Sequence, residues 1–147
     1  MIVLEMGEDM VKGFMGRLLK EDIFGEFRVR SVDVLAKNRF SIDGEYADGE
    51  ARAFSHWKEL RPLVFEIVRL MGRPGLMKIV FSHSEPAGVH ENASALFLNL
   101  MYDGGRLSFT TATSQRAFAL EKTLDQAWDG WVRGFFASIS IEVTDKE

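Results

Sequence analysis

The sequence predicts an α+β protein, in which a mainly antiparallel sheet of about five to seven strands packs against three amphipathic helices. Segments with strand-like alternation come in runs joined by tight turns, which is typical of antiparallel pairing. Three longer segments repeat apolar residues with the period of a helix, so each has one apolar face to bury. The expected order is β-α-β-β-α-β-β-β-α, with a final strand left open.

Length and composition predict one domain spanning residues 1–147. A chain of this length buries roughly two thirds of its unfolded surface without disulfides. Hydrophobic residues make up 46% and charged residues 27%, as in ordinary soluble globular proteins. Twelve phenylalanines and three tryptophans exclude a disordered chain, because so much aromatic surface must be buried.

The composition also excludes several classes of site and location. The absence of cysteine excludes disulfides, thiolate metal sites, iron–sulfur clusters and cysteine nucleophiles. No basic segment precedes the first apolar residues, so no signal peptide is expected, and no apolar run reaches the ~20 residues of a membrane span. Lys and Arg are interleaved with Asp and Glu, and the net charge is −4, which disfavours a nucleic-acid partner. We therefore expect a cytoplasmic protein with no membrane partner.

The first segments predict a short strand and a helix. Residues 1–6 have strand character, and Gly7 closes the strand. Residues 9–20 predict a helix with Asp9 as its N-cap. Its apolar half consists of Met10, Val11, Phe14, Met15, Leu18 and Leu19.

Residues 26–49 predict a β-hairpin. The apolar alternation of the first strand shifts by one position, which predicts a β-bulge near Arg30–Ser31. Lys37–Asn38 supplies the turn, because asparagine tolerates positive φ. The second strand alternates from Phe40 to Tyr46, with one side in solvent.

Residues 55–72 predict the second helix. Its apolar stripe consists of Trp57, Leu60, Leu63, Val64, Ile67, Val68 and Met71. Phe65 falls off this stripe and is expected to point away from the core. Pro62 lies too far in for the first turn of a helix capped by Ser55. Either the helix kinks there, or a short turn precedes a helix that begins near Pro62.

Three further strands are predicted at residues 76–81, 94–102 and 106–114. The Asp-Gly-Gly sequence at 103–105 is a strong hairpin signal between the last two. Both faces of 94–102 carry large apolar side chains, so this strand is expected at the centre of the sheet and buried on both sides. Residues 116–120 are expected to extend the sheet.

The last helix is predicted at residues 123–137, where Thr123 and Gln126 form a capping pattern. Gly130 and Gly134 are expected to let this helix approach a neighbour closely. The tail, residues 138–147, either adds an edge strand or frays.

The segment SHSEPAGVHEN, residues 82–92, is a candidate metal site. His83, Glu85, His90 and Glu91 lie between two predicted strands, and imidazoles with carboxylates suit zinc, manganese or non-haem iron. The spacing matches no metalloenzyme motif, and Glu-Pro and Ala-Gly are turn sequences. A polar hairpin loop is the favoured interpretation.

Other candidates have simpler structural interpretations. Trp57, Arg61 and Phe65 are the candidate interaction residues, with the guanidinium expected to lie over the indole. The hydroxyl-rich strand 108–115 suits polar ligands, although threonine is common in half-exposed strands. The carboxylates Asp43/Glu45 and Asp125/Asp129 lie on separate elements, and Asp129 is expected to bond Arg133.

Four stretches carry a family resemblance: VKGFMGRLL (11–19), WKELRP (57–62), KIVF (78–81) and LEKTLDQAWD (120–129). Together they resemble small uncharacterised bacterial proteins that are grouped only as a domain of unknown function. The resemblance spans most of the chain and implies a stand-alone cytoplasmic bacterial domain. It implies no activity, cofactor or catalytic residue.

These observations favour a binding or interaction domain without catalytic activity, whose partner is another protein or a second copy of the chain. The alternative is a small metal-dependent enzyme in which the His83–Glu91 loop holds a divalent metal; otherwise no cofactor is expected. A third interpretation, disfavoured by the acidic strand beside it, is a nucleic-acid-binding sheet that uses Arg28, Arg30, Lys37 and Arg39.

Overall fold

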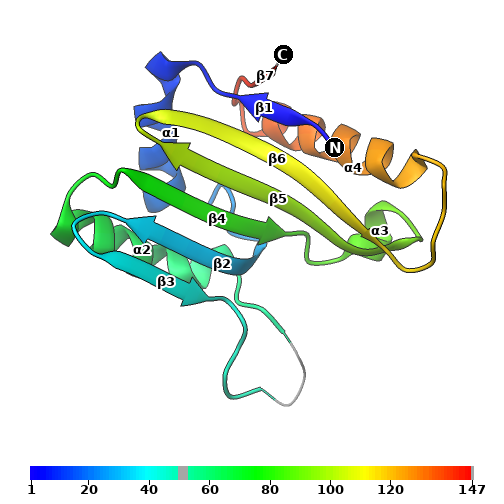
Figure 1. Cartoon of the computed structure of the whole chain (residues 1–147), viewed down its shortest axis with the longest axis horizontal. Coiled ribbons are helices and arrows are strands. Elements are labelled where there is room, and N and C mark those ends of the chain that lie inside the picture. The colour runs from blue at the N-terminus through cyan, green and yellow to red at the C-terminus, as the bar shows by residue number, and fades with distance from the viewer. Residues whose placement is uncertain (50–52, 147) are drawn as a thin grey trace.

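One antiparallel sheet of seven strands organises residues 1–49 and 53–146, which the computed structural model describes (Figure 1). The predicted α+β class is confirmed. In spatial order the strands are β3 (Arg39–Asp43), β2 (Arg28–Leu35), β4 (Leu76–Ser82), β5 (Ala93–Asp103), β6 (Arg106–Gln115), β1 (Val3–Glu5) and β7 (Thr144–Asp145). The helices are α1 (Glu8–Lys20), α2 (Trp57–Met71), the short α3 (Pro86–Val89) and α4 (Thr123–Ser138). Helix α3 was not predicted.

The two faces of the sheet differ in polarity. In Figure 1, α1, α2 and α4 lie behind the sheet and cover one face. A row of directly paired residues on that face is apolar: Leu4, Phe109, Leu100, Ile79, Val32 and Ile42. The neighbouring row, on the open face, is smaller and more polar: Val3, Thr110, Asn99, Val80, Ser31 and Asp43. The strand alternation therefore decides which face the helices cover.

Strand β5 lies at the centre of the sheet, as predicted, but it is buried on one face only. Leu96, Leu98 and Leu100 are fully buried under the helices. Phe97 and Met101 lie on the open face and are half-buried. The large apolar side chains on both faces of this strand therefore predicted its central position correctly. They also predicted that both faces would be covered, and that prediction was wrong.

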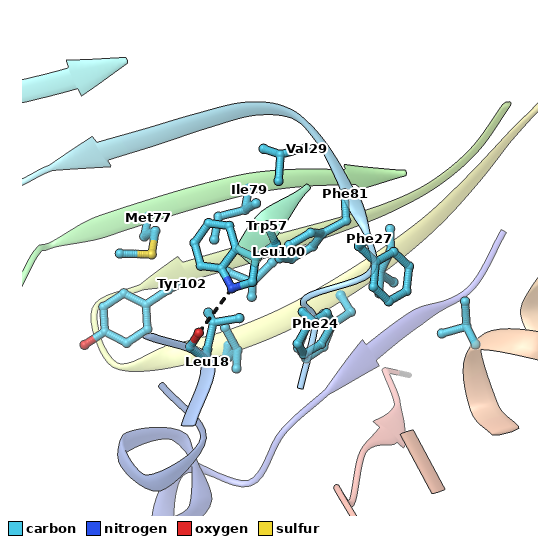
Figure 2. Close-up of a cluster of buried hydrophobic side chains, with 14 of the residues drawn as sticks. Leu18, Phe24, Phe27, Val29, Trp57, Met77, Ile79, Phe81, Leu100 and Tyr102 are labelled. Carbon is cyan, nitrogen blue, oxygen red and sulfur yellow. Dashed lines mark hydrogen bonds between the residues drawn. The ribbon is translucent and has the colours of Figure 1, made fainter. Parts of the chain in front are cut away.

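A cluster of aromatic side chains joins the helices to the covered face (Figure 2). Phe24, from the segment after α1, stacks on Phe81 with ring centroids 5.0 Å apart. Trp57, the first residue of α2, meets Phe81 edge-on at 5.6 Å and donates its indole N–H to the carbonyl oxygen of Leu18 at 3.1 Å. Burial of each such side chain contributes about 1.5–3 kcal/mol to folding.

The β2–β3 hairpin follows the prediction, with two corrections. The register between β2 and β4 shifts between Val29 and Ser31, which confirms the bulge. Strand β3 ends at Asp43, before the predicted end at Tyr46. The next residue, Gly44, donates its N–H to the Arg30 oxygen and lies so close to β2 that a Cβ atom there would be 1.8 Å from the Val29 oxygen. Asn38 does not adopt positive φ; the turn is closed by a bond from the Ala36 N–H to the Asn38 oxygen.

The helices begin and end close to the predicted positions. Helix α1 is capped by Gly7 and contains Asp9, and its Met10 is exposed rather than buried. Helix α4 starts at Thr123 after Lys122, so the predicted capping pattern does not form. The tail adds β7, which pairs with β1, and Glu147 lies outside the described residues.

Helix α2 begins at Trp57 and continues through Pro62, so it does not start late. Its buried face is centred on Trp57 and Val64. At 100° per residue Phe65 lies about 80° from Trp57 and Leu63 about 120°. Phe65 consequently packs against the core, whereas Leu63 is 51% exposed, the reverse of the prediction.

Residues 116–122 do not extend the sheet. Strand β6 ends at Gln115, and a loop leads from there to α4. Phe118 and Leu120 on this loop are 84% and 86% exposed. Within residues 1–49 and 53–146, no helix has the length and hydrophobicity needed to cross a membrane.

Candidate functional site

The two histidines of the predicted metal loop hold the backbone around them. His83 follows β4, and its ring stands edge-on to Trp131, with centroids 4.8 Å apart. Its Nδ1 accepts the Glu85 N–H at 2.9 Å. His90 ends α3, and its Nδ1 accepts the Asn92 N–H at 3.1 Å. One nitrogen of each ring is therefore engaged by the main chain.

The carboxylates of the same loop point into solvent. Glu85 precedes α3 without a side-chain cap bond, and both Glu85 and Glu91 are exposed. Across the described ranges, no three His, Asp or Glu side chains are gathered closely enough to hold a metal ion. The metal site built from these residues stays a prediction that the geometry does not support.

The environment of His83 favours its neutral form. Its half-buried ring lies against Trp128 and Trp131, and this burial lowers the pKa of the imidazole. The negative charge of Glu85 opposes the shift but does not reverse it. The His83 ring is thus uncharged at neutral pH.

The predicted interaction residues of α2 separate into buried and accessible groups. Trp57 is fully buried, so its indole is part of the core. Arg61 does not lie over the indole: it donates to the Leu19 oxygen at 3.3 Å and forms an ion pair with Asp22 at 2.9 Å. Arg61 and Phe65 line a shallow hollow beside Pro62, and their contact with a partner stays a prediction.

Helix α4 engages two hydroxyl groups of the hydroxyl-rich strand. The hydroxyls of Thr111 and Thr113 donate to the carboxylates of Asp129 and Asp125. Asp129 does not bond Arg133, whose guanidinium instead forms two hydrogen bonds with Asp145. The carboxylates therefore fix α4 against β6.

The two glycines of α4 do not serve close packing. Gly130 and Gly134 are exposed, and a Cβ atom at either position would meet no atom within 4 Å. The prediction that they let the helix approach a neighbour is wrong. Both lie on the solvent side of α4.

A tyrosine, a glutamate and a histidine meet at the start of α2. Tyr46 donates its hydroxyl to Glu59, which also accepts the His56 N–H at 2.9 Å. This bond raises the pKa of the Tyr46 phenol and lowers that of the Glu59 carboxyl. The phenol stays protonated, and its bond to Glu59 tethers the segment before α2.

Two of the four cations of the proposed nucleic-acid surface, Arg28 and Arg30, are engaged within the protein, whereas Lys37 and Arg39 are exposed. Arg28 donates to the Phe54 oxygen at 2.7 Å. The Arg30 guanidinium lies 4.0 Å from the ring centroid of Phe54 and 5.2 Å from that of Phe97. Phosphate contacts need accessible cations, so Arg28 and Arg30 are poorly placed to make them, and nucleic-acid binding through this surface stays a prediction.

Residues 116–122, called here the exposed loop, are held by two amide side chains. Asn92 donates to the Ala117 oxygen at 2.9 Å and accepts the Ala117 N–H at 3.0 Å. Gln115 makes the same pair of bonds with Ala119, both at 3.1 Å. The backbone is therefore fixed at alternate residues, on either side of the exposed Phe118.

An aromatic pocket lies between α4 and the segment that joins α1 to β2. It has a volume of about 210 Å³ and is lined by Ile23, Phe24, Phe27, His83, Trp131 and Phe135. Trp131 and Phe135 stack with centroids 5.6 Å apart, and Phe27 meets both edge-on. The exposed carboxylates of Asp22 and Glu26 stand at its rim.

The sequence predicted neither the exposed loop nor the aromatic pocket. Arg-Ala-Phe-Ala-Leu alternates like a strand, and alternation does not tell whether a neighbouring strand is present. The amides Gln115 and Asn92 were the available signal, because such side chains often bond the backbone of loops. The aromatic pocket joins residues about a hundred positions apart and left no local signal.

Comparisons with known proteins identify a family but no function. Neither the comparison with curated proteins nor the comparison with solved structures found a match. A family model matches residues 17–144, which include the aromatic pocket and the exposed loop. The chain belongs to this family, DUF5721, a family of unknown function.

Proposed function

We propose that this chain is a small binding domain of the bacterial cytoplasm, without catalytic activity, that associates with a second copy of itself. The observation that carries the proposal is the exposed loop, where Phe118 and Leu120 stand 84% and 86% in solvent. The cytoplasmic bacterial setting is supported by the resemblance in sequence. The engagement of His83, His90 and the α4 carboxylates by structural hydrogen bonds supports a non-catalytic role.

The exposed loop has the energetics of a docking element. Burying a side chain such as Phe or Leu stabilises a fold or a complex by about 1.5–3 kcal/mol. In the single chain Phe118 and Leu120 are exposed, so this stabilisation is available only on binding. Binding is opposed by the entropy of ordering flexible segments. The bonds from Asn92 and Gln115 already order this loop, which lowers that cost.

The aromatic pocket of a second copy matches the exposed loop in shape and charge. Its volume of about 210 Å³ and its aromatic walls suit one large apolar side chain such as Phe118. Arg116 and Lys122 flank the loop, which also contains Glu121, whereas Asp22 and Glu26 flank the pocket and pair there with Arg61 and Lys58. Exposed ion pairs of this kind are weak, so both carboxylates still attract the cations of the loop. Opposite charges around an apolar centre favour the correct docking. In a two-fold dimer this contact is made twice.

Sedimentation equilibrium over a wide concentration range tests the proposal. The wild type is expected to dimerise reversibly. The double variant Phe118→Ser/Leu120→Ser is expected to raise the dissociation constant roughly a hundredfold, as for central apolar contacts of an interface. The matched control is Leu70→Ser on α2, a side chain 65% exposed and outside the loop, which should leave the constant unchanged.

Two outcomes would overturn self-association through the loop. One is a wild type that stays monomeric at every concentration. The other is a double variant that dimerises as tightly as the wild type, or no more weakly than the Leu70→Ser control. Circular dichroism of each variant establishes that the fold is retained, as expected for exposed positions.

A further inference from the structure

A second cavity opens between α1 and α2, at the end of the sheet where β5 turns into β6. It has a volume of about 560 Å³, within the range of sites for small molecules. Most of its surface is apolar, and the apolar side chains are Val11, Met15, Leu19, Val68, Pro74 and Met77. We call it the interhelix groove. The exposed loop follows the opposite end of β6 (Figure 1), so the two features are independent.

A guanidinium and a phenol meet at this groove. Arg73 donates its Nε hydrogen to the Tyr102 hydroxyl at 2.7 Å. Figure 2 shows the Tyr102 oxygen directed away from the aromatic cluster. Because the phenol oxygen accepts this bond, its own proton is available to a second acceptor. The guanidinium also keeps its Nη groups, which hydrogen-bond planar anions well.

The glycine at the hairpin turn leaves room for the guanidinium. Gly105 has φ +85° in a turn with Gly104, which also has positive φ. A Cβ atom at Gly105 would lie 2.8 Å from Arg73 Nη2. A side chain at this position would therefore displace the guanidinium.

The charge at the groove is positive. Arg73 and Lys12 both line it, and within the described residues neither forms an ion pair with a carboxylate. The carboxylate that lines the groove, Glu8, lies 3.4 Å from Arg106 Nε, so its charge is balanced by a third cation. An apolar groove that ends in unpaired cations and a phenol donor suits a ligand with an apolar chain and an anionic head.

We propose that the interhelix groove binds an amphipathic carboxylate, a molecule of the fatty-acid class. The apolar chain lies along Val11, Val68 and Met77, and the carboxylate accepts hydrogen bonds from Arg73 and Tyr102. Lys12, which also lines the groove, adds a second positive charge. The proposal does not depend on self-association, because the groove shares no residue with the exposed loop or the aromatic pocket.

Isothermal titration calorimetry with three probes of equal chain length tests the proposal. The probes are decanoate and decylamine, each below its micellar concentration, and decanol below its solubility limit. Decanoate is expected to bind with one-to-one saturation. Decanol keeps the chain and loses the charge, so it should bind at least tenfold more weakly. Decylamine brings a cation to a cationic site and should not saturate.

Variants of the full chain locate the site. Arg73→Gln is expected to weaken decanoate at least tenfold, and Tyr102→Phe and Lys12→Gln to weaken it severalfold. Lys12 is exposed, so its variant tests the head group even if a change at the buried Tyr102 disturbs folding. The matched control is Arg69→Gln, an arginine on α2 that is paired with Glu66 outside the groove.

The proposal is overturned by any of three results. They are decanoate that shows no saturable binding, decanol or decylamine that binds as tightly as decanoate, and Arg73→Gln or Lys12→Gln that weakens decanoate no more than Arg69→Gln does. The oligomeric state is measured on the same samples. Loss of decanoate binding with self-association intact then separates failure here from failure of the proposed function.

Discussion

Two loops lie side by side at one end of the sheet, and they differ in whether their side chains bond within the protein or stay exposed to solvent. Residues 83–92 carry the imidazoles and carboxylates that suggest chemistry, yet His83 and His90 accept hydrogen bonds from their own backbone. The exposed loop, residues 116–122, contains the predicted strand extension 116–120, yet its Phe118 is almost entirely exposed to solvent. Asn92 joins the two loops through its bonds to Ala117.

Residue type alone therefore does not assign a role to a loop. A polar side chain that satisfies a backbone group stabilises the fold and is no longer available for a ligand. An apolar side chain that is held in solvent contributes no burial free energy to the single chain, and it would contribute this free energy on binding a partner.

The link between the loops should be the most sensitive position. Asn92→Ala removes two side-chain bonds, each worth about 0.5–1.5 kcal/mol, so the free energy of unfolding should fall by about 1–3 kcal/mol. Self-association should also weaken, because the exposed loop would no longer be ordered. Urea unfolding measures the first effect and sedimentation the second. Asn99→Ala, on the open face of the sheet, is the control and should change neither.

The charges beside the loop should matter next. Arg116→Glu/Lys122→Glu is expected to raise the dissociation constant of the dimer about tenfold, or about 1.4 kcal/mol, at low salt, and less at high salt. Adding Glu26→Lys to this variant should recover part of the affinity. If the reversed pocket charge weakens the dimer further, the loop does not face the rim of the aromatic pocket.

The burial of His83 predicts a smaller, pH-dependent effect. Its pKa is lowered from the ordinary value of 6.5 in the folded state, so below that value the unfolded chain binds more protons. The neutral ring therefore contributes stability that is fully present above pH 6.5. This stability is lost as the pH falls through the folded pKa.

His83→Asn should remove this dependence, so the stability difference from wild type should change with pH only in the window below 6.5. Thermal unfolding across that window measures the change. The same scan of His90→Asn is the control, because His90 lies outside the aromatic cluster. An unchanged slope in His83→Asn would mean that the ring is not sheltered by Trp128 and Trp131.

Added metal ions are expected to have no effect on stability. Titration with zinc, manganese, nickel and iron(II) should leave the melting temperature of the wild type unchanged, and equally that of His83→Ala/His90→Ala. A ligand that binds only the folded state raises the melting temperature, and the shift grows with the logarithm of the ligand concentration relative to the dissociation constant. A shift in the wild type that the double variant lacks would restore the metal-dependent enzyme as the better hypothesis.

The sequence contained the local structure of the fold. Alternation placed the strands and the bulge at Val29–Ser31, and Asp103-Gly104-Gly105 predicted a turn that forms with positive φ at both glycines. The order of the strands, the open face of β5 and the fate of Phe65 depend on how elements pack. A pattern along one element does not contain that information.

The candidate sites were less predictable for the same reason. The interhelix groove combines Val11, Val68 and Tyr102, and the aromatic pocket combines Phe27 with Trp131. Each becomes a site only when distant segments are brought together. The hydrogen bond from the Glu85 N–H to His83 is local in sequence. A histidine that binds its own backbone and a histidine that binds a metal nevertheless have the same sequence pattern, so the sequence does not distinguish the two roles.

Cysteine cross-linking between two copies tests whether the exposed loop of one copy enters the aromatic pocket of the other. The chain has no cysteine of its own, so there is no background reaction. A copy carrying Leu120→Cys is mixed with a copy carrying Glu26→Cys under mild oxidation, and Leu70→Cys replaces Leu120→Cys in the control. If the loop of one copy enters the aromatic pocket of the other, the first mixture forms a mixed disulfide rapidly and the control does not. Equal, slow cross-linking in both mixtures would contradict the account.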